Sequence, residues 1–302
     1  RVLTAFDLFL RAPAPPAAKP DWVLQFGATP VSAALQRYLA TCGARRFLIG
    51  TGGDWQDPTR GAASRLLADA VPLAEALVSL APATADRDWG EAWSEAEARG
   101  AALAATPELR PPEADIVTAL ESALPPNAPL FVGNSLPIRA VDQFARGHDQ
   151  PLAIHGNRGL SGIDGNVSTA LGIGYAGGRR PVALLGDLTL YHDMNGLLAT
   201  RDSPADIVLL NNGGGGIFGL LPQSGLPAFE RLWLTPTDLD PARIAALYEL
   251  DYQQPATGDA LATALETRAW QRFHGPGGWR LDADPLVPMA GGEVALADDV
   301  LP

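Results

Sequence analysis

Two short apolar runs of the chain end in residues that can bind a metal ion or a phosphate. The run 181–185 is followed by Gly186-Asp187, and the run 206–210 is followed by Asn211-Asn212-Gly213-Gly214. A segment of helical length separates the runs, so we expect two adjacent parallel strands. Parallel strands present their carboxyl ends at one edge of a sheet, where ligands of open α/β sheets bind. The residues after the two runs are therefore predicted to lie together.

These residues offer hard oxygen ligands. We predict metal ligation by the Asp187 carboxylate, the Asn212 side-chain amide and the Gly214 carbonyl. Such a set suits Mg²⁺, which takes few carboxylates and keeps positions for phosphate oxygens, and the sequence does not distinguish it from Mn²⁺. A helix opening after Leu188 would direct free N–H groups at an anion. Taken singly, an Asp after a strand is common in α/β proteins and Asn-Asn-Gly is more typical of a turn, and only their pairing favours a magnesium–diphosphate site.

Two further polar loops follow predicted strands. Gly133-Asn-Ser-Leu-Pro-Ile-Arg139 follows the apolar run 129–132, and Gly156-Asn-Arg-Gly-Leu-Ser-Gly-Ile-Asp-Gly165 follows 151–154. They contribute Arg139 and Arg158, whose planar guanidinium groups bind carboxylates through two hydrogen bonds. Further donors in these loops are Asn134, Ser135, Asn157 and Ser161. Surface ion pairing is the ordinary alternative for an arginine, but the shared edge favours a binding role.

Histidine and cysteine chemistry receives little support. His192 follows the predicted metal-binding strand and could act as a general acid or base, and a hydrogen-bonded structural role is at least as well supported. His148, His155 and His274 show no metal-ligand spacing. The single cysteine, Cys42, is expected to be a buried apolar residue; one cysteine rules out an internal disulfide and fits a reducing, cytoplasmic compartment.

Composition excludes several classes of protein. The chain has 302 residues, 47% of them hydrophobic, and a formal net charge of −12. This charge argues against non-specific binding to nucleic acid or to an anionic membrane, and no apolar run is long enough to span a bilayer. The length favours two domains of ordinary size. The chain lacks an initiator Met, so we expect a piece of a longer protein.

Apolar runs alternate with helical patterns, which is typical of an α/β fold with parallel sheets. We predict two doubly wound domains, residues 1–108 and 109–302, with a boundary near Pro111-Pro112. Strands are predicted at 22–26, 46–49, 129–132, 151–154, 181–186 and 206–211. Helices are predicted at 31–42, 91–105, 115–124, 138–145, 166–176, 242–250 and 259–269. From about residue 270 no convincing strand pattern remains, and we expect an irregular tail.

Together these motifs resemble the 2-succinyl-5-enolpyruvyl-6-hydroxy-3-cyclohexene-1-carboxylate synthase (MenD) family of thiamine-diphosphate enzymes. The resemblance covers roughly residues 20–270 and is densest from 131 to 222. Gly-Asp followed by Asn-Asn is similar to the thiamine-diphosphate motif, with Leu188 in place of the usual second glycine. Acetolactate synthases and pyruvate decarboxylases carry Gly-Asp-Gly and lack the arginine-bearing loops.

The resemblance implies roles for individual residues. Asp187, Asn212 and Gly214 would hold Mg²⁺ (or Mn²⁺) and through it the cofactor diphosphate. Ile163 would be the bulky residue beneath the thiamine. The implied cofactor-binding set is Asn134, Ser161, Ile163, Gly186, Asp187, Leu188, Asn212, Gly214, Ile217, Phe218 and Leu221. The implied catalytic set, which would handle the substrate carboxylates, is Ser135, Arg139 and Arg158, with Ile163.

The resemblance also implies a reaction: decarboxylation of 2-oxoglutarate and addition of the resulting succinyl carbanion to isochorismate, in menaquinone biosynthesis. It implies a middle domain over 1–108, a diphosphate-binding domain over 109–302, and a homo-oligomer, either dimer or tetramer. In the family a pyrimidine-binding domain supplies the activating glutamate, and no such domain precedes Arg1. We therefore expect these residues alone to be inactive. The alternatives are a catalytically silent cofactor-binding or partner module, complemented by a separate pyrimidine-domain chain, and an acetolactate-synthase-like enzyme.

Overall fold

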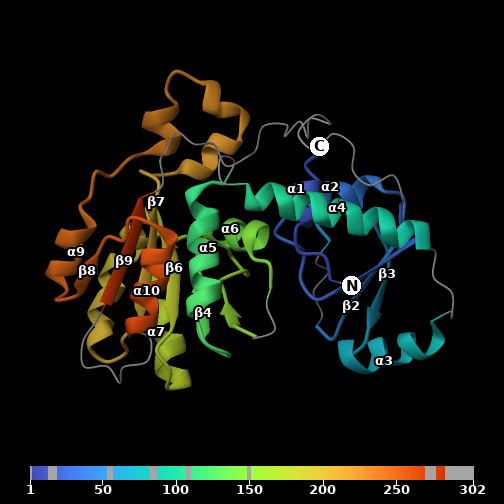
Figure 1. Cartoon of the computed structure of the whole chain (residues 1–302), viewed down its shortest axis with the longest axis horizontal. Coiled ribbons are helices and arrows are strands. Elements are labelled where there is room, and N and C mark those ends of the chain that lie inside the picture. The colour runs from blue at the N-terminus through green and yellow to red at the C-terminus, as the bar shows by residue number, and fades with distance from the viewer. Residues whose placement is uncertain are drawn as a thin grey trace. The chain divides into compact units, whose positions relative to one another are not determined.

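The computed structural model describes residues 2–12, 19–52, 57–81, 87–106, 110–147, 151–268 and 277–282. These form two compact units that divide between Ala105 and Thr106 (Figure 1). Each unit is an α/β structure built on a parallel sheet, as the sequence predicted. The assignment of residues 1–108 and 109–302 to a middle and a diphosphate-binding domain stays a prediction.

The first unit contains a three-stranded parallel sheet in the order β1-β2-β3. Its strands are β1 (Trp22–Phe26), β2 (Arg45–Gly50) and β3 (Ala62–Leu67). Only α2 (Ala33–Thr41) connects β1 to β2, with Ser32 accepting the Leu35 N–H as its cap. The remaining helices of this unit are α1 (Phe6–Phe9), α3 (Ala70–Leu80) and α4 (Arg87–Ala105).

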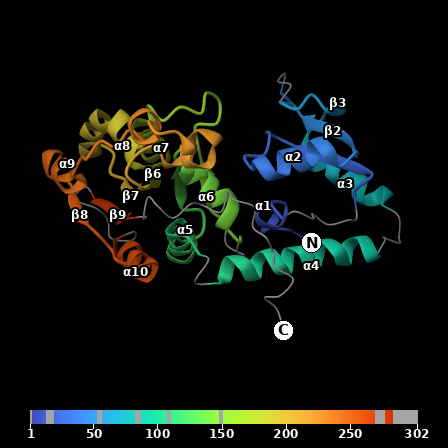
Figure 2. The same ribbon diagram turned by 90° about the horizontal axis from the view of Figure 1, so that it is seen from above.

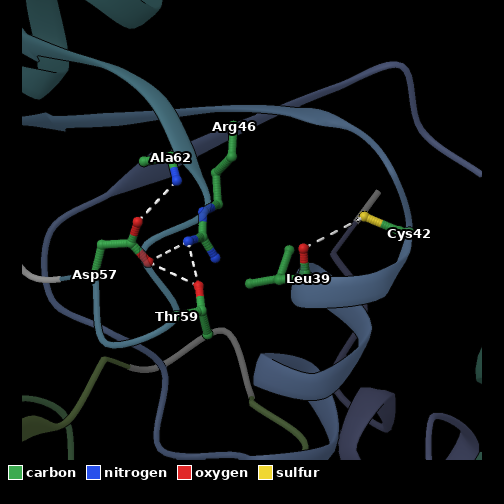
Figure 3. Close-up of polar contacts among 6 residues, drawn as sticks. All are labelled: Leu39, Cys42, Arg46, Asp57, Thr59 and Ala62. Atoms are coloured by element: carbon green, nitrogen blue, oxygen red, sulfur yellow. Dashed lines mark hydrogen bonds and ion pairs between the residues drawn. The ribbon is translucent and has the colours of Figure 1, made fainter.

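A small aromatic core joins α1, α2 and α4. The Trp93 ring lies 5.8 Å from Phe9 and 5.6 Å from Tyr38, both in edge-on geometry. Cys42 is buried in the same cluster, as predicted, and its thiol contacts the Leu39 carbonyl oxygen (Figure 3). This core leaves the opposite side of β1 open, since Trp22, Leu24 and Phe26 are exposed.

A buried ion pair ties β2 to the turn before β3 (Figure 3). The Arg46 guanidinium donates to the Asp57 carboxylate and, at 2.6 Å, to the Thr59 hydroxyl. The second Asp57 oxygen accepts the Ala62 N–H at 2.7 Å. Both charged side chains are almost fully buried. The network satisfies both Asp57 oxygens, while among the described residues the buried Arg46 Nε has no hydrogen-bond partner.

The second unit is built on a six-stranded parallel sheet in the order β5-β4-β6-β7-β9-β8. The chain runs outward from β4 (Pro129–Val132) to β5 (Ala153–His155) and then crosses back to β6 (Val182–Gly186). The strand order therefore reverses between β4 and β6, which is the point at which ligands bind in open α/β sheets. The sheet continues with β7 (Asp206–Asn211), β9 (Gly277–Asp282) and β8 (Asp251–Gln253).

Helices cover both faces of this sheet, as a doubly wound fold requires (Figure 2). One core contains residues of α5 (Pro112–Ala123) and α10 (Gly258–Arg268), with α6 (Leu136–Phe144) against it. The other contains residues of α7 (Asn166–Gly177), α8 (Asp187–His192), the 3-10 helix η2 (Met194–Arg201) and α9 (Pro241–Leu247). Strands β4, β6 and β7 are consequently buried on both faces, which explains their continuous apolar sequence.

Three short helical segments lie between β7 and α9. These are the 3-10 helices η3 (Gly216–Leu220) and η4 (Pro222–Gly225) and the π-helix η5 (Glu230–Leu234). Among the helices that the structure describes, none combines the length and the apolar character needed to cross a membrane.

The structure corrects one expectation from the sequence. The prediction of an irregular tail from about residue 270 is wrong for Gly277–Asp282, because this segment forms strand β9 between β7 and β8. The sequence Gly-Gly-Trp-Arg-Leu-Asp lacks the pattern of a strand, but pairing on both sides satisfies its backbone groups. The rest of the tail, residues 283–302, and His148 and His274 lie outside the described residues. Strands β3 and β8 were not predicted, because neither carries a regular alternation of apolar residues.

Candidate functional site

The loops after β4, β5, β6 and β7 meet around one cavity of about 110 Å³ at the carboxyl edge of the second sheet. Many of the residues predicted from the sequence line this cavity: Ser135, Ile163, Gly186, Asp187, Leu188, Asn212, Gly214, Ile217 and Phe218. The loop after β4 is held there by the Gly133 N–H, which donates to the Leu184 carbonyl at 2.8 Å. The cavity therefore lies at the point where the strand order reverses.

Glycine is required at the floor of this cavity. Gly214 has φ +129°, and a Cβ on it would overlap the Leu234 carbonyl oxygen. A Cβ on Gly215 would lie 2.5 Å from the Trp233 carbonyl oxygen, and the Gly215 N–H donates to the Leu234 carbonyl at 2.6 Å. The chain after β7 thus runs directly against η5, and a side chain at Gly214 or Gly215 would prevent this approach.

The oxygen atoms predicted as metal ligands have suitable surroundings. Asn212 is buried, and among the described residues its Oδ1 has no hydrogen-bond partner. A buried acceptor without a partner is unfavourable unless something binds it. Asp187 begins α8, and its Oδ1 accepts the Leu188 N–H at 2.9 Å. The Gly214 carbonyl accepts the Gly216 N–H at 2.9 Å and keeps a second lone pair. These donors fit a small hard cation.

Within the described residues, no group of three or more His, Cys, Asp or Glu side chains could hold a metal ion. The predicted set is of a different kind, since it combines one carboxylate, one amide and one main-chain carbonyl, and Mg²⁺ accepts such a mixture with phosphate oxygens.

Two serines of the predicted site have backbone angles that are unusual for a residue with a side chain. Ser135 has φ +72° where it precedes α6, and Ser161 has φ +53° in the loop after β5. Left-handed geometry is unfavourable for non-glycine residues and is concentrated at binding sites. Ser135 lines the cavity, whereas Ser161 does not.

Arg139 and Arg158 lie close enough to repel each other. Burial first, and then the charge of Arg158, lower the pKa of the Arg139 guanidinium, while Asp142 opposes this shift. Each guanidinium donates to a neutral oxygen: Arg139 to the Ser135 carbonyl at 2.7 Å, and Arg158 to the Asn134 Oδ1 at 2.6 Å. In the described part of the chain neither arginine forms an ion pair within 4 Å. Two neighbouring cations without an ion pair within 4 Å would attract an anion, although the Asp142 charge acts on Arg139.

Not every predicted residue lines the cavity. The exceptions are Asn134, Ser161, Leu221 and the two arginines. Leu221 follows η3 and is 42% exposed, and Asn134 is buried between two loops. His192 is exposed at the end of α8, with its ring 5.6 Å from that of Tyr191. Their predicted roles stay predictions.

Several lining residues were missed from the sequence: Leu136, Pro137, Thr189, Leu210 and Gly215. Each lies within or beside a quoted motif, so proximity to the motifs was the available signal. Phe218 also contacts the Trp233 ring of η5, with centroids 5.9 Å apart. The tryptophan was not singled out because the segment around it carries no motif.

No protein-family model matches the sequence, but similar proteins are found among curated sequences. The 2-succinyl-5-enolpyruvyl-6-hydroxy-3-cyclohexene-1-carboxylate synthase of Bacillus velezensis is 38% identical over 276 residues, which are 89% of this chain and 48% of that protein. The synthase of the same name from Geobacillus kaustophilus is 44% identical over 255 residues, 82% of this chain and 44% of that protein. That of Haloarcula marismortui is 40% identical over 240 residues.

The chain thus spans less than half the length of these relatives. The resemblance expected from the motifs is confirmed: over most of its length, this chain is similar to the 2-succinyl-5-enolpyruvyl-6-hydroxy-3-cyclohexene-1-carboxylate synthases.

Proposed function

We propose that this chain forms the cofactor-diphosphate part of a thiamine-diphosphate-dependent 2-succinyl-5-enolpyruvyl-6-hydroxy-3-cyclohexene-1-carboxylate synthase. The whole protein would use 2-oxoglutarate and isochorismate. One observation carries the proposal: Asn212, whose buried Oδ1 has no hydrogen-bond partner in the described part of the chain, shares a cavity with Asp187 and Gly214 at the reversal of the strand order. The named relatives support the reaction class.

In this proposal Asp187, Asn212 and the Gly214 carbonyl hold Mg²⁺ or Mn²⁺. The metal ion in turn binds the diphosphate, leaving few charges for the protein itself to neutralise. Ile163, Ile217 and Phe218 form the apolar wall against the thiamine rings, because they line the same cavity. The bound cofactor would supply the electron sink that decarboxylation of a 2-oxo acid requires.

Arg139 and Arg158 receive the carboxylates of the substrates. Both substrates are polyanions, and a pair of neighbouring guanidinium groups provides charge and bidentate hydrogen bonds for them. Ser135, held at positive φ, adds a hydroxyl at the edge of the cavity. These residues orient the substrate rather than exchange protons with it, since arginine keeps its proton at neutral pH.

The chain would require more than the residues described here for turnover. We expect it to bind the cofactor but not to turn over substrate by itself, because the resemblance places the activating glutamate in a pyrimidine-binding domain. In the whole protein, a further segment or a complementing chain would supply that domain, and we propose that the whole protein is a homo-oligomer, either dimer or tetramer. A cytoplasmic location rests on the single cysteine alone.

Calorimetric titration of thiamine diphosphate into the chain with Mg²⁺ tests the proposal. We expect binding by the wild-type chain and a loss of about 100-fold or more in the Asp187→Ala variant, because a ligand to the metal is removed. Asp202→Ala is the matched control, since it removes an exposed carboxylate near the end of η2, outside the cavity. Equal binding by wild type and Asp187→Ala would refute the metal assignment.

A further inference from the structure

One buried amide connects the two arginine-bearing loops of the second unit. Asn134, in the loop after β4, is 1% exposed. Its Nδ2 donates to the Asn157 carbonyl at 3.0 Å and to the Gly162 carbonyl at 2.6 Å. Its Oδ1 accepts from Arg158 Nη1 at 2.6 Å. These three hydrogen bonds all go to the loop after β5, and they use both N–H donors of the amide.

Asn134 holds Arg158 without neutralising it. The amide oxygen carries only a partial charge, so it can orient the guanidinium group while the full positive charge remains. An aspartate at the same place would form an ion pair and remove the charge. Since Arg139 also lies near Arg158, the neutral acceptor keeps a site with two positive charges.

The Asn134 side chain also holds the main chain next to a residue that lines the cavity. Gly162, whose carbonyl accepts from Asn134, directly precedes Ile163, which lines the cavity. Gly162 also accepts from Asn166 Nδ2 at 3.1 Å. Two buried amides therefore fix the main chain beside Ile163, but only that of Asn134 also contacts Arg158.

We infer that Asn134 is a positioning residue that aims Arg158 at an anionic dicarboxylate substrate, and that it does not contact the cofactor. This inference rests on the proposed function and departs from the cofactor-binding role predicted for Asn134 from the sequence. Arg158 would contact the substrate, whereas Asn134, which is buried, would act on the substrate only through Arg158.

The test compares Asn134→Ala with Asn166→Ala in the complete enzyme that contains this chain. Both variants remove a buried asparagine that binds the Gly162 carbonyl, and only the first removes the contact with Arg158. We expect the KM for 2-oxoglutarate to rise about tenfold or more in Asn134→Ala, because a hydrogen bond to a charged group is lost. We expect a smaller rise in Asn166→Ala, and a thiamine diphosphate Kd that changes equally in both.

The double variant Asn134→Ala/Arg158→Ala separates positioning from general loss of structure. If Asn134 acts through Arg158, the double variant has the same KM as Arg158→Ala alone. Additive effects, or a cofactor Kd that rises in Asn134→Ala but not in Asn166→Ala, would overturn the inference.

Failure of the proposed function gives a different result, namely a wild-type protein that binds no thiamine diphosphate. The inference is then judged on crystal structures of the two variants. Displacement of the Arg158 side chain in Asn134→Ala but not in Asn166→Ala supports the positioning role, and an unmoved Arg158 in both refutes it.

Discussion

Arg46 in the first unit and the pair Arg139 and Arg158 in the second are held by different kinds of partner. Arg46 is 5% exposed and meets the Asp57 carboxylate and the Thr59 hydroxyl (Figure 3). Arg139 and Arg158 lie near each other, and their hydrogen bonds go to a main-chain carbonyl and an amide oxygen.

The difference distinguishes an arginine that maintains a fold from one that is available to a ligand. A buried guanidinium with a carboxylate completes an internal network, and removing either partner leaves an unpaired charge. Guanidinium groups held only by neutral oxygens keep their charge for an external anion. In this molecule the second kind occurs at the carboxyl edge of the larger sheet and beside its cavity loops.

The largest expected effect is on stability, in the first unit. Asp57→Ala should lower the free energy of unfolding of that unit by about 3–5 kcal/mol, because it leaves Arg46 buried without a counter-charge. Urea unfolding measured beside Asp21→Ala, which removes an exposed carboxylate before β1, provides the control. A loss below about 1 kcal/mol would contradict the assignment of Arg46 to the fold.

For Arg139→Gln we expect little change in stability and a loss of substrate affinity. The substitution removes one of two neighbouring cations, so the free energy of unfolding should change by less than about 1 kcal/mol, while the affinity of the complete enzyme for 2-oxoglutarate falls about tenfold or more. Arg37→Gln, at an exposed position on α2, should change neither quantity. Marked destabilisation with unchanged substrate affinity would place Arg139 in the same class as Arg46.

The smallest effect concerns pH. Burial alone would raise the pKa of Asp57, but hydrogen bonds from Ala62, Thr59 and Arg46 and the Arg46 charge lower it below its ordinary value of 3.8. Its contribution to stability is therefore complete above the unfolded pKa and is lost only as pH falls through the lower, folded value. In the second unit, burial raises the pKa of Glu113 above 4.5. Protonated Glu113 stabilises the folded state, so its contribution to the free energy of unfolding is lost as pH rises from the unfolded pKa through the higher, folded pKa.

Unfolding curves between pH 3 and pH 6, followed separately for the two units, check these opposite slopes. We expect Asp57→Asn to reduce the loss of unfolding free energy at acid pH in the first unit. We expect Glu113→Gln to reduce the decrease in unfolding free energy with rising pH in the second unit. Equal slopes in the two units would show that other groups dominate.

The sequence was sufficient for the elements whose local pattern is unambiguous. Strands β1 and β4 have the predicted bounds, because apolar runs between proline, glycine and polar residues leave little choice. Strand β3 was missed because Ala-Ala-Ser-Arg-Leu-Leu does not alternate, and it pairs only with β2 on one side. Strand β9 owes its form to neighbours on both sides, which a local pattern does not report.

The candidate site was predicted in the same way. Motifs at the ends of strands identified Asp187, Asn212 and Gly214, since parallel strands bring such residues to one edge. The hydrogen bond between Asn134 and Arg158 could not be predicted from the sequence, because it depends on the paths of two loops. The positive φ of Ser135 was likewise invisible, as nothing in its neighbours requires it.

The glycines after β7 have a consequence for inheritance. Every missense change of a glycine codon adds at least a Cβ, and at Gly214 and Gly215 that atom meets the carbonyl oxygens of Leu234 and Trp233. Any amino-acid substitution at either position is therefore destabilising unless η5 changes as well. Natural variation at the codons of Gly214 and Gly215 should be confined to silent substitutions. Gly219, whose Cβ would meet open space, should tolerate other residues.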